Sequence, residues 1–447
     1  MGSAHWPNAG VDCCVPVLEN GASPRSYLDR AWALLALFVL LFGTELARVP
    51  SQGWDTFYAE DGRTFVGDWV STSKLTMLFQ PYAGYQHLLP RVITWLVVHL
   101  MPITWWANGV IAFSALTVSG VACLVFVASR DVLTTTVARL GAAAVPVFLP
   151  LARFEAIGNV ANLHSYMLYL IPWLFLARSR SQAAAVGFAA AAAVAVMTEP
   201  QCVIFLPLAV IVWFWRRDSR WVVVGWALGA AGQTITYLHY AGIRPSSLDN
   251  FRSWVEGYAV NAVATDAVPS GARLGSLVAR FGWWPAMSAA VVFFGIAIFA
   301  GLIGSRWLRV LVLTVSLASV ASWSASFFLN DHRAFDYDAL SPGQLASIPF
   351  VRWGIGAGML IACVIPIGAD AVATRWPKSR WVGVAMVAVM IVVMGLWFDA
   401  GDTTRGGPRW HGGLQAARVQ CAVTSRTSVE IPSFPVSWFV KIPCGDL

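Results

Sequence analysis

The sequence predicts an all-α, polytopic membrane protein with about eleven to twelve transmembrane helices. Of its 447 residues, 57% are hydrophobic and only 12% are charged, and the mean hydropathy is +0.64. Soluble domains carry roughly a quarter charged residues. A helix that spans a bilayer needs roughly 20 mostly apolar residues, and such stretches recur from Trp32 almost to Phe398. A lipid bilayer is therefore the expected environment of most of the chain.

The basic residues lie mainly in short clusters between apolar runs. The net charge of +7 would also suit a nucleic-acid-binding protein, but clusters of this kind mark the cytoplasmic loops of membrane proteins. We therefore expect membrane lipids, and no nucleic acid, among the partners. Four clusters define the orientation: Arg178 with Arg180; Arg216, Arg217 and Arg220; Arg306 with Arg309; and Arg375, Lys378 and Arg380.

Eleven spans follow from these clusters, near 31–47, 106–128, 133–151, 162–177, 182–198, 201–215, 221–240, 283–304, 310–328, 351–371 and 381–398. Residues 1–30 then form a cytoplasmic N-terminal segment, and 31–398 form the helical domain. No small-residue cleavage site follows the first span, so it is expected to stay as a signal anchor. The apolar segment Val92–Met101 is short and is expected to be half-inserted or re-entrant, which leaves a twelfth span open.

On this topology four large polar segments lie outside the cytoplasmic membrane: 48–91, 241–282, 329–350 and 399–447. The last is an extracytoplasmic tail that contains Cys421 and Cys444. These two cysteines can close a small loop, because disulfides form on the oxidising side of the membrane. Free cysteines inside apolar helices usually act as small hydrophobic residues, and this is expected for Cys123, Cys202 and Cys363.

The first outer loop, 48–91, holds the strongest chemical signal. Glu60 and Asp61 stand side by side within Trp54–Gly62, soon after the first span. An aromatic segment rich in proline and glycine, Pro81–Arg91, then returns toward the membrane.

At these residues the chain resembles the GT-C superfamily of integral membrane glycosyltransferases, which use polyprenyl-phosphate-linked sugars. The resemblance rests on the hydropathy plan and on the acidic pair in the first loop. It implies that Glu60 and Asp61 act as catalytic base or metal ligands, with Mg²⁺ or Mn²⁺ as the possible divalent cation. It also implies a polyprenyl-phosphate sugar as donor and a cell-envelope glycan, lipid or protein as acceptor. Frequent Ala, Trp and Arg with few Lys residues suit a high-GC bacterium.

A carboxylate suits this reaction because the acceptor hydroxyl must lose its proton as it attacks the anomeric carbon, and a nearby general base removes that proton. The leaving lipid phosphate is already a weak base, so a protonating acid is less needed than in glycoside hydrolysis. We expect Asp61 to be the base and Glu60 to orient the site or help to hold a divalent ion. The alternative for both is a solvated loop residue or a helix cap before Gly62. Asp55 and Asp68 are expected to be surface charges.

Two arginines are candidates for binding the donor phosphate, because a guanidinium offers bidentate donors to phosphate. Arg352, in Pro349–Trp353, resembles the arginine–aromatic signature found at this place in several GT-C-type enzymes, although Trp353 stands where the family usually has tyrosine. Arg91 is the second candidate. Arginines at a membrane border also commonly extend toward headgroups without a catalytic role.

Further polar residues near the outer ends of helices are candidates for substrate binding. Polar side chains at that depth usually face a cavity or a partner helix, so helix capping is the alternative. Glu199 is expected to cap a helix or form a turn, and no zinc-binding spacing connects the histidines. The candidates are Tyr85, His87, Asn162, His164 and His332.

The leading hypothesis is a glycosyltransferase that works at the outer face of the membrane, with inversion if the displacement is a single step. The rival is a transporter or lipid flippase. Transporters often consist of two related halves with polar residues at the bilayer midplane, and neither feature is visible in this sequence. A catalytically inactive scaffold on the same fold is the third alternative.

Overall fold

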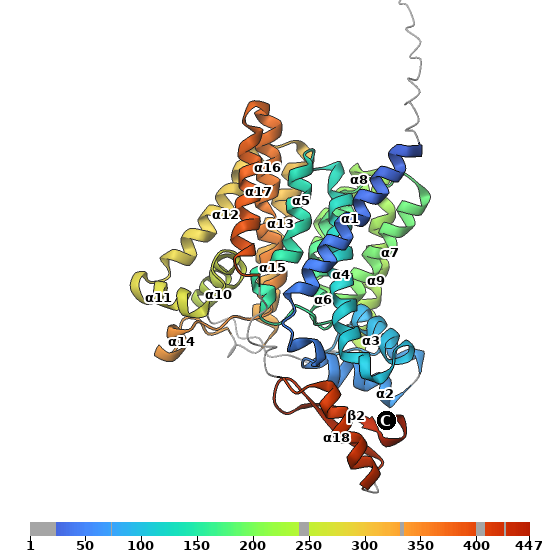
Figure 1. The fold of residues 1–447 in the computed structure, drawn as a ribbon. Coiled ribbons are helices and arrows are strands. Elements are labelled where there is room, and N and C mark those ends of the chain that lie inside the picture. Colours follow the sequence, from blue (N-terminus) through green and yellow to red (C-terminus); the bar gives the residue numbers. More distant parts are fainter. Residues whose placement is uncertain (1–23, 73, 241–249, 331–334, 399–406, 424–425) are drawn as a thin grey trace, which may run out of the picture.

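The structure is a computed structural model that describes residues 24–72, 74–240, 250–330, 335–398, 407–423 and 426–447. Within these residues the chain is mainly helical (Figure 1). The elements are α1 (Pro24–Arg48), α2 (Gly67–Ser71), α3 (Leu88–Leu100), α4 (Trp106–Ala128), α5 (Thr136–Phe148), α6 (Leu163–Leu176), α7 (Gln182–Thr198), α8 (Leu206–Trp215), α9 (Arg220–Tyr240), α10 (Phe251–Tyr258), α11 (Gly271–Phe281), α12 (Trp284–Ile303), α13 (Arg306–Leu329), α14 (Pro342–Ala346), α15 (Gly354–Ala362), α16 (Val364–Arg375), α17 (Arg380–Gly395), α18 (Trp410–Val423), β1 (Ser428–Ser433) and β2 (Trp438–Pro443).

Seven helical segments of the described residues are long and apolar enough to cross a membrane: Ala31–Arg48, Ile103–Asp131, Thr136–Arg153, Trp284–Ile303, Arg306–Leu329, Gly354–Arg375 and Pro377–Gly395. Four more apolar helices are shorter: Leu88–Leu100, Leu163–Leu176, Gln182–Thr198 and Pro200–Trp215. Each of the eleven expected spans coincides with a helix or with consecutive helical segments. The helical membrane bundle is therefore confirmed, but the expected count of eleven to twelve full crossings is not.

Two helices show why helix count and span count differ. α3 has 13 residues and is about 20 Å long at 1.5 Å per residue, which is less than the roughly 30 Å of a bilayer core. α9 has 21 residues, but its second half contains polar side chains that bind the first loop. The Gln233 side chain accepts from the backbone N–H of Gln86 at 3.0 Å, and Thr236 accepts from the Gln86 side chain at 2.8 Å.

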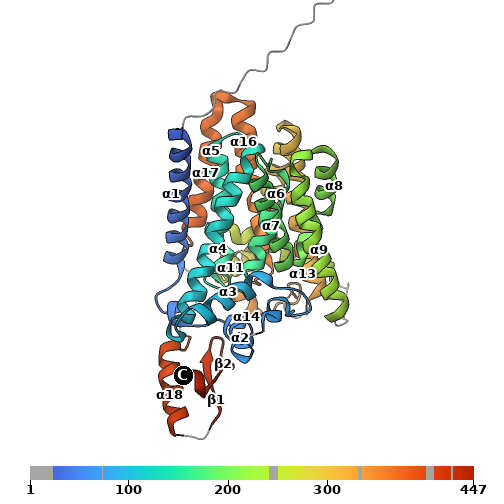
Figure 2. The same cartoon turned by 90° about the vertical axis from the view of Figure 1, so that its right-hand side faces the viewer.

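The bundle has a protein-filled centre and a lipid-facing rim. In Gly354–Arg375, which contains α15 and α16, 94% of the span is buried, whereas only 17% of Ala31–Arg48 is buried. Figure 2 shows α1 along the edge of the bundle. In α6 every residue except His164 is buried. α6 and α15 therefore form the centre, and α1 contributes an apolar surface to the bilayer.

Small residues let α7 and α9 pack closely. A side chain at Gly225 of α9 would meet the backbone oxygen of Ala189 at 2.0 Å, so no larger residue fits there. Close packing of small residues is a common way for membrane helices to associate.

The long polar segments gather at one end of the bundle. In both views α2, α3, α14 and the C-terminal α18 lie at the lower end, whereas the turn between α16 and α17 lies at the upper end (Figures 1 and 2). The structure thus groups together the segments that the charge pattern assigned to one side of the membrane. The predicted N-terminal segment lies mostly outside the described residues.

The C-terminal cap (residues 407–423 and 426–447) corrects the all-α prediction. It contains α18 and an antiparallel pair of strands, with Ser428 opposite Pro443 and Ser433 opposite Trp438. Alternate residues of β1 point inward, which is the two-residue period of a strand with one buried face. A six-residue strand gives too short a pattern to stand out in a polar tail. The expected Cys421–Cys444 disulfide is present and ties α18 to the end of the chain.

Arg48, at the end of α1, connects three helices in the interior. Its fully buried guanidinium donates to the carbonyl oxygens of Val147, Leu149 and Phe398, and lies 3.6 Å from Glu45. A buried charge is tolerated when it is paired and hydrogen-bonded. Arg48 therefore ties α1 to the ends of α5 and α17.

We expect Arg48→Met to destabilise the protein by about 3–5 kcal/mol, because removal of one member of a buried ion pair leaves Glu45 without a counter-charge. Thermal unfolding in detergent measures the effect. The control Arg180→Ala removes a 65% exposed partner of Asp131 and should cost at most about 1 kcal/mol. Equal melting temperatures for both variants would contradict the structural role of Arg48.

Candidate active site

The acidic pair of the first loop lies in a backbone of unusual shape. Ala59, directly before Glu60, has a φ of +41°, a left-handed conformation that costs energy for residues other than glycine. Asp61 then begins a π-helical stretch, Asp61–Val66. Strained backbone and π-helical turns are often found at functional sites. The two carboxylates consequently leave the loop in different directions.

The C-terminal cap holds this backbone in place. The N–H of Phe434, between β1 and β2, donates to Phe57 O at 3.0 Å, and the N–H of Ala59 donates to Phe434 O. Gly62 is required here, because a Cβ atom would lie 2.9 Å from both Phe57 Cβ and Val440 Cγ2. The cap thus fixes the conformation of the residues on both sides of Glu60 and Asp61.

Two further contacts anchor the cap. Trp410 is buried, donates its indole N–H to Ile103 O at 2.7 Å and packs edge-on against Phe57. Asp55 pairs with His411 at 2.5 Å. Asp55 was expected to be a surface charge; the structure gives it a partner in the cap.

We expect the cap to be necessary for the geometry of the acidic loop. Replacing Cys421 and Cys444 together by serine opens a loop with a sequence separation of 23 residues, which should cost about 3 kcal/mol. The variant should melt at a lower temperature than wild type and lose activity. Cys123→Ser, which changes a free and half-buried thiol, is the matched control. A double variant as active as this control would show that the cap has no influence on the loop.

Asp61 lies in the interior and connects the first loop to residues 160 and 161. Its side chain accepts the backbone N–H of Val160 at 3.1 Å and that of Ala161 at 3.0 Å. Burial raises the pKa of Asp61 well above its ordinary value, although the two N–H groups act in the opposite direction. Both oxygens are occupied, so Asp61 acts as a structural link in this arrangement.

Glu60 points to a different place and forms a cluster with Arg352 and Glu155. Arg352 Nη2 lies 3.0 Å from one Glu60 oxygen, and Nη1 lies 3.4 Å from the other. The same Nη1 lies 3.3 Å from Glu155. Burial alone would lower the pKa of Arg352, but the two carboxylates outweigh it and the pKa is raised. Burial raises the pKa of Glu155. One guanidinium therefore forms ion pairs with two acids.

Two tyrosines surround this cluster. Burial raises the pKa of Tyr58, and the negative charge of Glu155 adds to the effect. Burial and the charge of Glu60 raise the pKa of Tyr82. Both phenols thus stay protonated at neutral pH beside the carboxylates, where a substrate with hydroxyl groups would find hydrogen-bond donors.

Glu60 and Asp61 do not offer a preformed site for a divalent cation. Arg352 donates to both oxygens of Glu60, and backbone N–H groups donate to both oxygens of Asp61. Among the residues that the structure describes, no group of three or more His, Cys, Asp or Glu side chains could hold a metal ion. The Mg²⁺ or Mn²⁺ ion stays a prediction.

Arg91 has a structural environment. Its guanidinium pairs with Asp68 at 2.6 Å, donates to Gln80 O at 3.2 Å and lies over the ring of Phe65. Arg91 is buried. Asp68 was expected to be a surface charge, but it is partly buried and pairs with Arg91. The two residues hold the returning part of the first loop, and Arg352 is the better placed of the two phosphate candidates.

His87 and Tyr85 lie together beside the cluster. The two ring centroids are 4.2 Å apart, and the ring of His164 lies 6.3 Å from that of His87. His87 is buried. Burial is the main reason that the pKa of His87 lies well below its usual value, and the charges of Arg91 and Arg352 act in the same direction, whereas a backbone hydrogen bond with Tyr82 opposes them; the imidazole of His87 is therefore neutral at pH 7.

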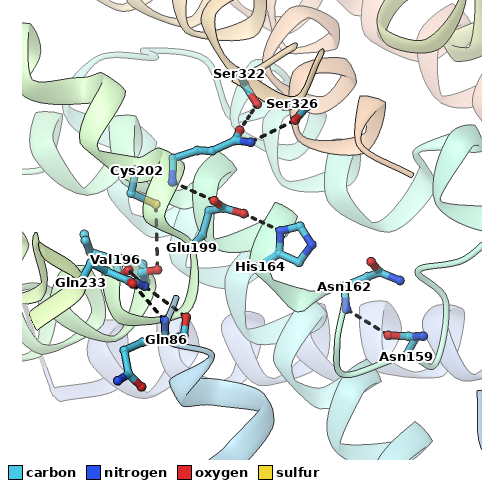
Figure 3. A network of polar contacts seen from close by, with 12 residues as sticks. Gln86, Asn159, Asn162, His164, Val196, Glu199, Cys202, Gln233, Ser322 and Ser326 are labelled. Atoms are coloured by element: carbon cyan, nitrogen blue, oxygen red, sulfur yellow. Dashed lines mark hydrogen bonds and ion pairs between the residues drawn. The ribbon is translucent and has the colours of Figure 1, made fainter. Parts of the chain in front are cut away.

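Asn162, directly before α6, and His164, in the first turn of α6, are also substrate candidates, and they contact different residues. The Asn162 side chain donates to Glu155 O at 3.0 Å and therefore holds the Glu155 backbone. His164 is hydrogen-bonded to Glu199, as Figure 3 shows. His332 lies outside the described residues.

Sequence reasoning missed Glu155, Tyr58 and Tyr82, and assigned Glu199 to a cap or turn. Glu199 does cap a helical turn, through the N–H of Gln201 at 2.8 Å, but it also binds His164. The signal that could have found Glu155 is its position just before the polar segment 158–166, at the end of a hydrophobic helix.

No protein-family profile matches this chain, and no curated protein sequence is significantly similar to it.

Proposed function

We propose that this protein is a membrane glycosyltransferase that moves a sugar from a polyprenyl-phosphate donor to an acceptor hydroxyl of a cell-envelope glycan, lipid or protein. The observation that carries the proposal is the cluster of Glu60, Arg352 and Glu155, which lies beside two protonated tyrosines. The proposal also uses the resemblance of the first loop to the GT-C superfamily.

In the proposed mechanism the donor phosphate competes with Glu60 for Arg352. Arginine forms bidentate hydrogen bonds with phosphate as well as with carboxylate. When the phosphate binds the guanidinium, Glu60 is released from its ion pair and becomes free to accept a proton. Glu155 stays beside Arg352 and keeps it oriented. Binding of the donor thus activates the base.

The chemical step is a displacement at the anomeric carbon. The acceptor oxygen forms a bond to that carbon, the bond between carbon and phosphate oxygen breaks, and polyprenyl phosphate leaves with the electron pair. Glu60 takes the proton of the acceptor hydroxyl. A single displacement inverts the anomeric configuration.

This mechanism exchanges the roles expected from sequence for the two acids. Asp61 accepts two backbone N–H groups and is fully enclosed, which supports a role as the link between the first loop and α6. Glu60 faces the arginine that would bind the phosphate, which supports its role as the base.

We also propose that the end of the bundle with the cap faces outside the cytoplasmic membrane, with the N-terminus inside. The Cys421–Cys444 disulfide supports this orientation because disulfides persist in oxidising compartments. Ser51→Cys, near the acids, should react with a membrane-impermeant maleimide in intact cells, whereas Lys378→Cys should react only after lysis. The reverse pattern would refute the orientation.

The test of activity uses purified protein in proteoliposomes with a panel of ¹⁴C-labelled polyprenyl-phosphate monosaccharides and a delipidated envelope fraction as acceptor. We expect label to move from at least one lipid into the fraction. The rival transporter predicts that the lipid-linked sugar crosses the bilayer uncleaved. A full panel without cleavage, together with transbilayer movement, would favour the rival.

A further inference from the structure

His164, in the first turn of α6, and Glu199, at the end of α7, form a dyad that the proposed transfer step does not use. His164 Nδ1 is hydrogen-bonded to one oxygen of Glu199, which is buried, and the other oxygen accepts the N–H of Gln201. The Gln201 side chain is in turn held by two serines of α13, accepting from Ser322 at 2.5 Å and donating to Ser326 at 3.0 Å. The dyad is therefore rigidly supported by three helical elements.

This arrangement determines which nitrogen of His164 is available. The Glu199 carboxylate accepts a hydrogen bond from Nδ1–H of His164, so in the neutral ring Nε2 carries the free lone pair. Figure 3 shows the imidazole turned with one edge toward Glu199, so that its far edge points away from that carboxylate. The side chain of His164 is 17% exposed, so it is not fully enclosed by the protein.

A second polar side chain beside the dyad, His87, lacks a well-formed hydrogen bond, and a backbone contact with Tyr82 is its nearest polar interaction. His87 is only 3% exposed, and neither of its ring nitrogens has a hydrogen-bond partner of good geometry among the described residues. Buried polar atoms are normally satisfied. Because the ring of His87 is neutral, it offers one donor and one acceptor, close to the free acceptor of His164.

We propose that His87 and His164 form a saccharide subsite that binds the hydroxyl groups of a sugar ring, with Glu199 as the residue that positions His164. A neutral hydroxyl both donates and accepts, so neighbouring hydroxyls match this set of one donor and two acceptors. A metal ion fits this subsite less well, because it would need further anionic ligands. An anion also fits less well, because the lone pair of His164 Nε2 would repel it. Tyr85, whose ring is tilted by 34° against that of His87, adds an aromatic surface for the sugar.

Sugar binding at this subsite does not depend on the proposed transferase activity. Only the question whether the bound sugar belongs to the donor or to the acceptor rests on the proposed function, because both carry the same hydroxyl groups. The local contacts connect the subsite to the first loop. Asp61 accepts the N–H of Val160 and Ala161, which lie four and three positions before His164 and so place the start of α6 against the first loop.

The first test is binding without turnover. Methyl α-D-mannopyranoside, methyl β-D-galactopyranoside, methyl α-D-glucopyranoside and methyl α-D-arabinofuranoside are titrated against the purified protein labelled with ¹⁵N-histidine. We expect at least one glycoside to shift the Nε2 resonance of His164. His164→Asn keeps an amide donor for Glu199 but lacks the far nitrogen, and should weaken that glycoside about five- to tenfold.

The control is His99→Asn, which changes an exposed histidine of α3 and should leave binding unchanged. Glu199 is tested through its effect on the ring. In Glu199→Gln the neutral ring of His164 should no longer prefer the tautomer with hydrogen on Nδ1, and glycoside binding should weaken. Glu199→Asp, which keeps a carboxylate, should restore part of the tautomer preference and part of the binding. A Nε2 resonance of His164 that no glycoside shifts, or a protonated Nε2 in the wild-type neutral ring, would overturn the proposal.

The source of the sugar is identified in the transfer assay. If His164→Asn raises the KM of the polyprenyl-phosphate sugar, the subsite binds the donor; if it changes only the saturation by the envelope fraction, the subsite binds the acceptor. Unchanged values for both would refute a saccharide subsite. Because glycoside binding is measured without transfer, it can succeed where the proposed transferase activity fails, and the reverse also holds.

Discussion

Glu60→Gln is expected to lower the rate of sugar transfer by about 10²–10⁴-fold, which is the usual contribution of a positioned general base. The amide has nearly the same shape as the carboxylate but cannot take the acceptor proton. Stability should change little, because Arg352 keeps Glu155 as a partner at 3.3 Å. Initial rates with the labelled lipid donor, together with thermal unfolding, measure both effects.

Asp61→Asn gives the comparison that separates the two acids. An asparagine places an N–H group against the N–H of Val160 or Ala161, so this variant should lose stability along with activity. The matched control is Glu430→Gln, which makes the same change at an exposed position of β1 and should behave as wild type. A Glu60→Gln variant with normal rates, beside a stable but inactive Asp61→Asn variant, would return the role of base to Asp61.

Arg352→Met is expected to have the second largest effect, on stability as well as on transfer. The variant leaves Glu60 and Glu155 close together without a counter-charge. Breaking a fully buried pair costs about 3–5 kcal/mol; because the side chains of Arg352 and Glu155 are 28% and 29% exposed, we expect about 2–4 kcal/mol at pH 7. Transfer should fall below detection because the donor phosphate loses its bidentate partner.

The stability of Arg352→Met should depend on pH in a definite direction. Burial already raises the pKa of Glu155 in the wild type, and loss of the positive charge raises it further. The folded state then binds more protons than the unfolded state between the two pKa values, so stability increases as the pH falls. The deficit relative to wild type should shrink between pH 7 and pH 5.

The triple variant Arg352→Met with Glu60→Gln and Glu155→Gln tests the cause of this loss. With both carboxylates neutralised it should regain most of the stability at pH 7 and still transfer no sugar. If the triple variant melts as low as Arg352→Met, unpaired charge is not the source of the instability.

The sequence was sufficient to predict the features that depend on composition and local pattern. Apolar runs placed the helices, because the bilayer requires about 20 apolar residues per crossing. The sequence could not give the number of full crossings. Short helices such as α6 lie in the protein-filled centre of the bundle, where the thickness of the bilayer does not determine the length of a helix. The disulfide was predicted from two cysteines in a polar tail, but the β-hairpin that it supports was not.

The composition of the site was only partly predictable, because its residues are brought together from far apart. Glu60 and Arg352 are 292 positions apart along the chain, and the direction of Glu60 depends on a positive φ at Ala59 that the cap residue Phe434 helps to hold. No local pattern carries that information. Glu199 seemed to be a helix cap because it is one, and its second contact with His164 depends on how α6 packs.

A doubly labelled donor, with ³H in the polyprenyl chain and ¹⁴C in the sugar, tests the central claim most directly. The purified protein in proteoliposomes is incubated with such donors and the envelope fraction. The account predicts that wild type separates the two labels, with ¹⁴C in the acceptor and ³H in polyprenyl phosphate, and that Glu60→Gln leaves them together. Separation at the same rate in both proteins would contradict it, as would labels that stay together in the wild type for every donor tested.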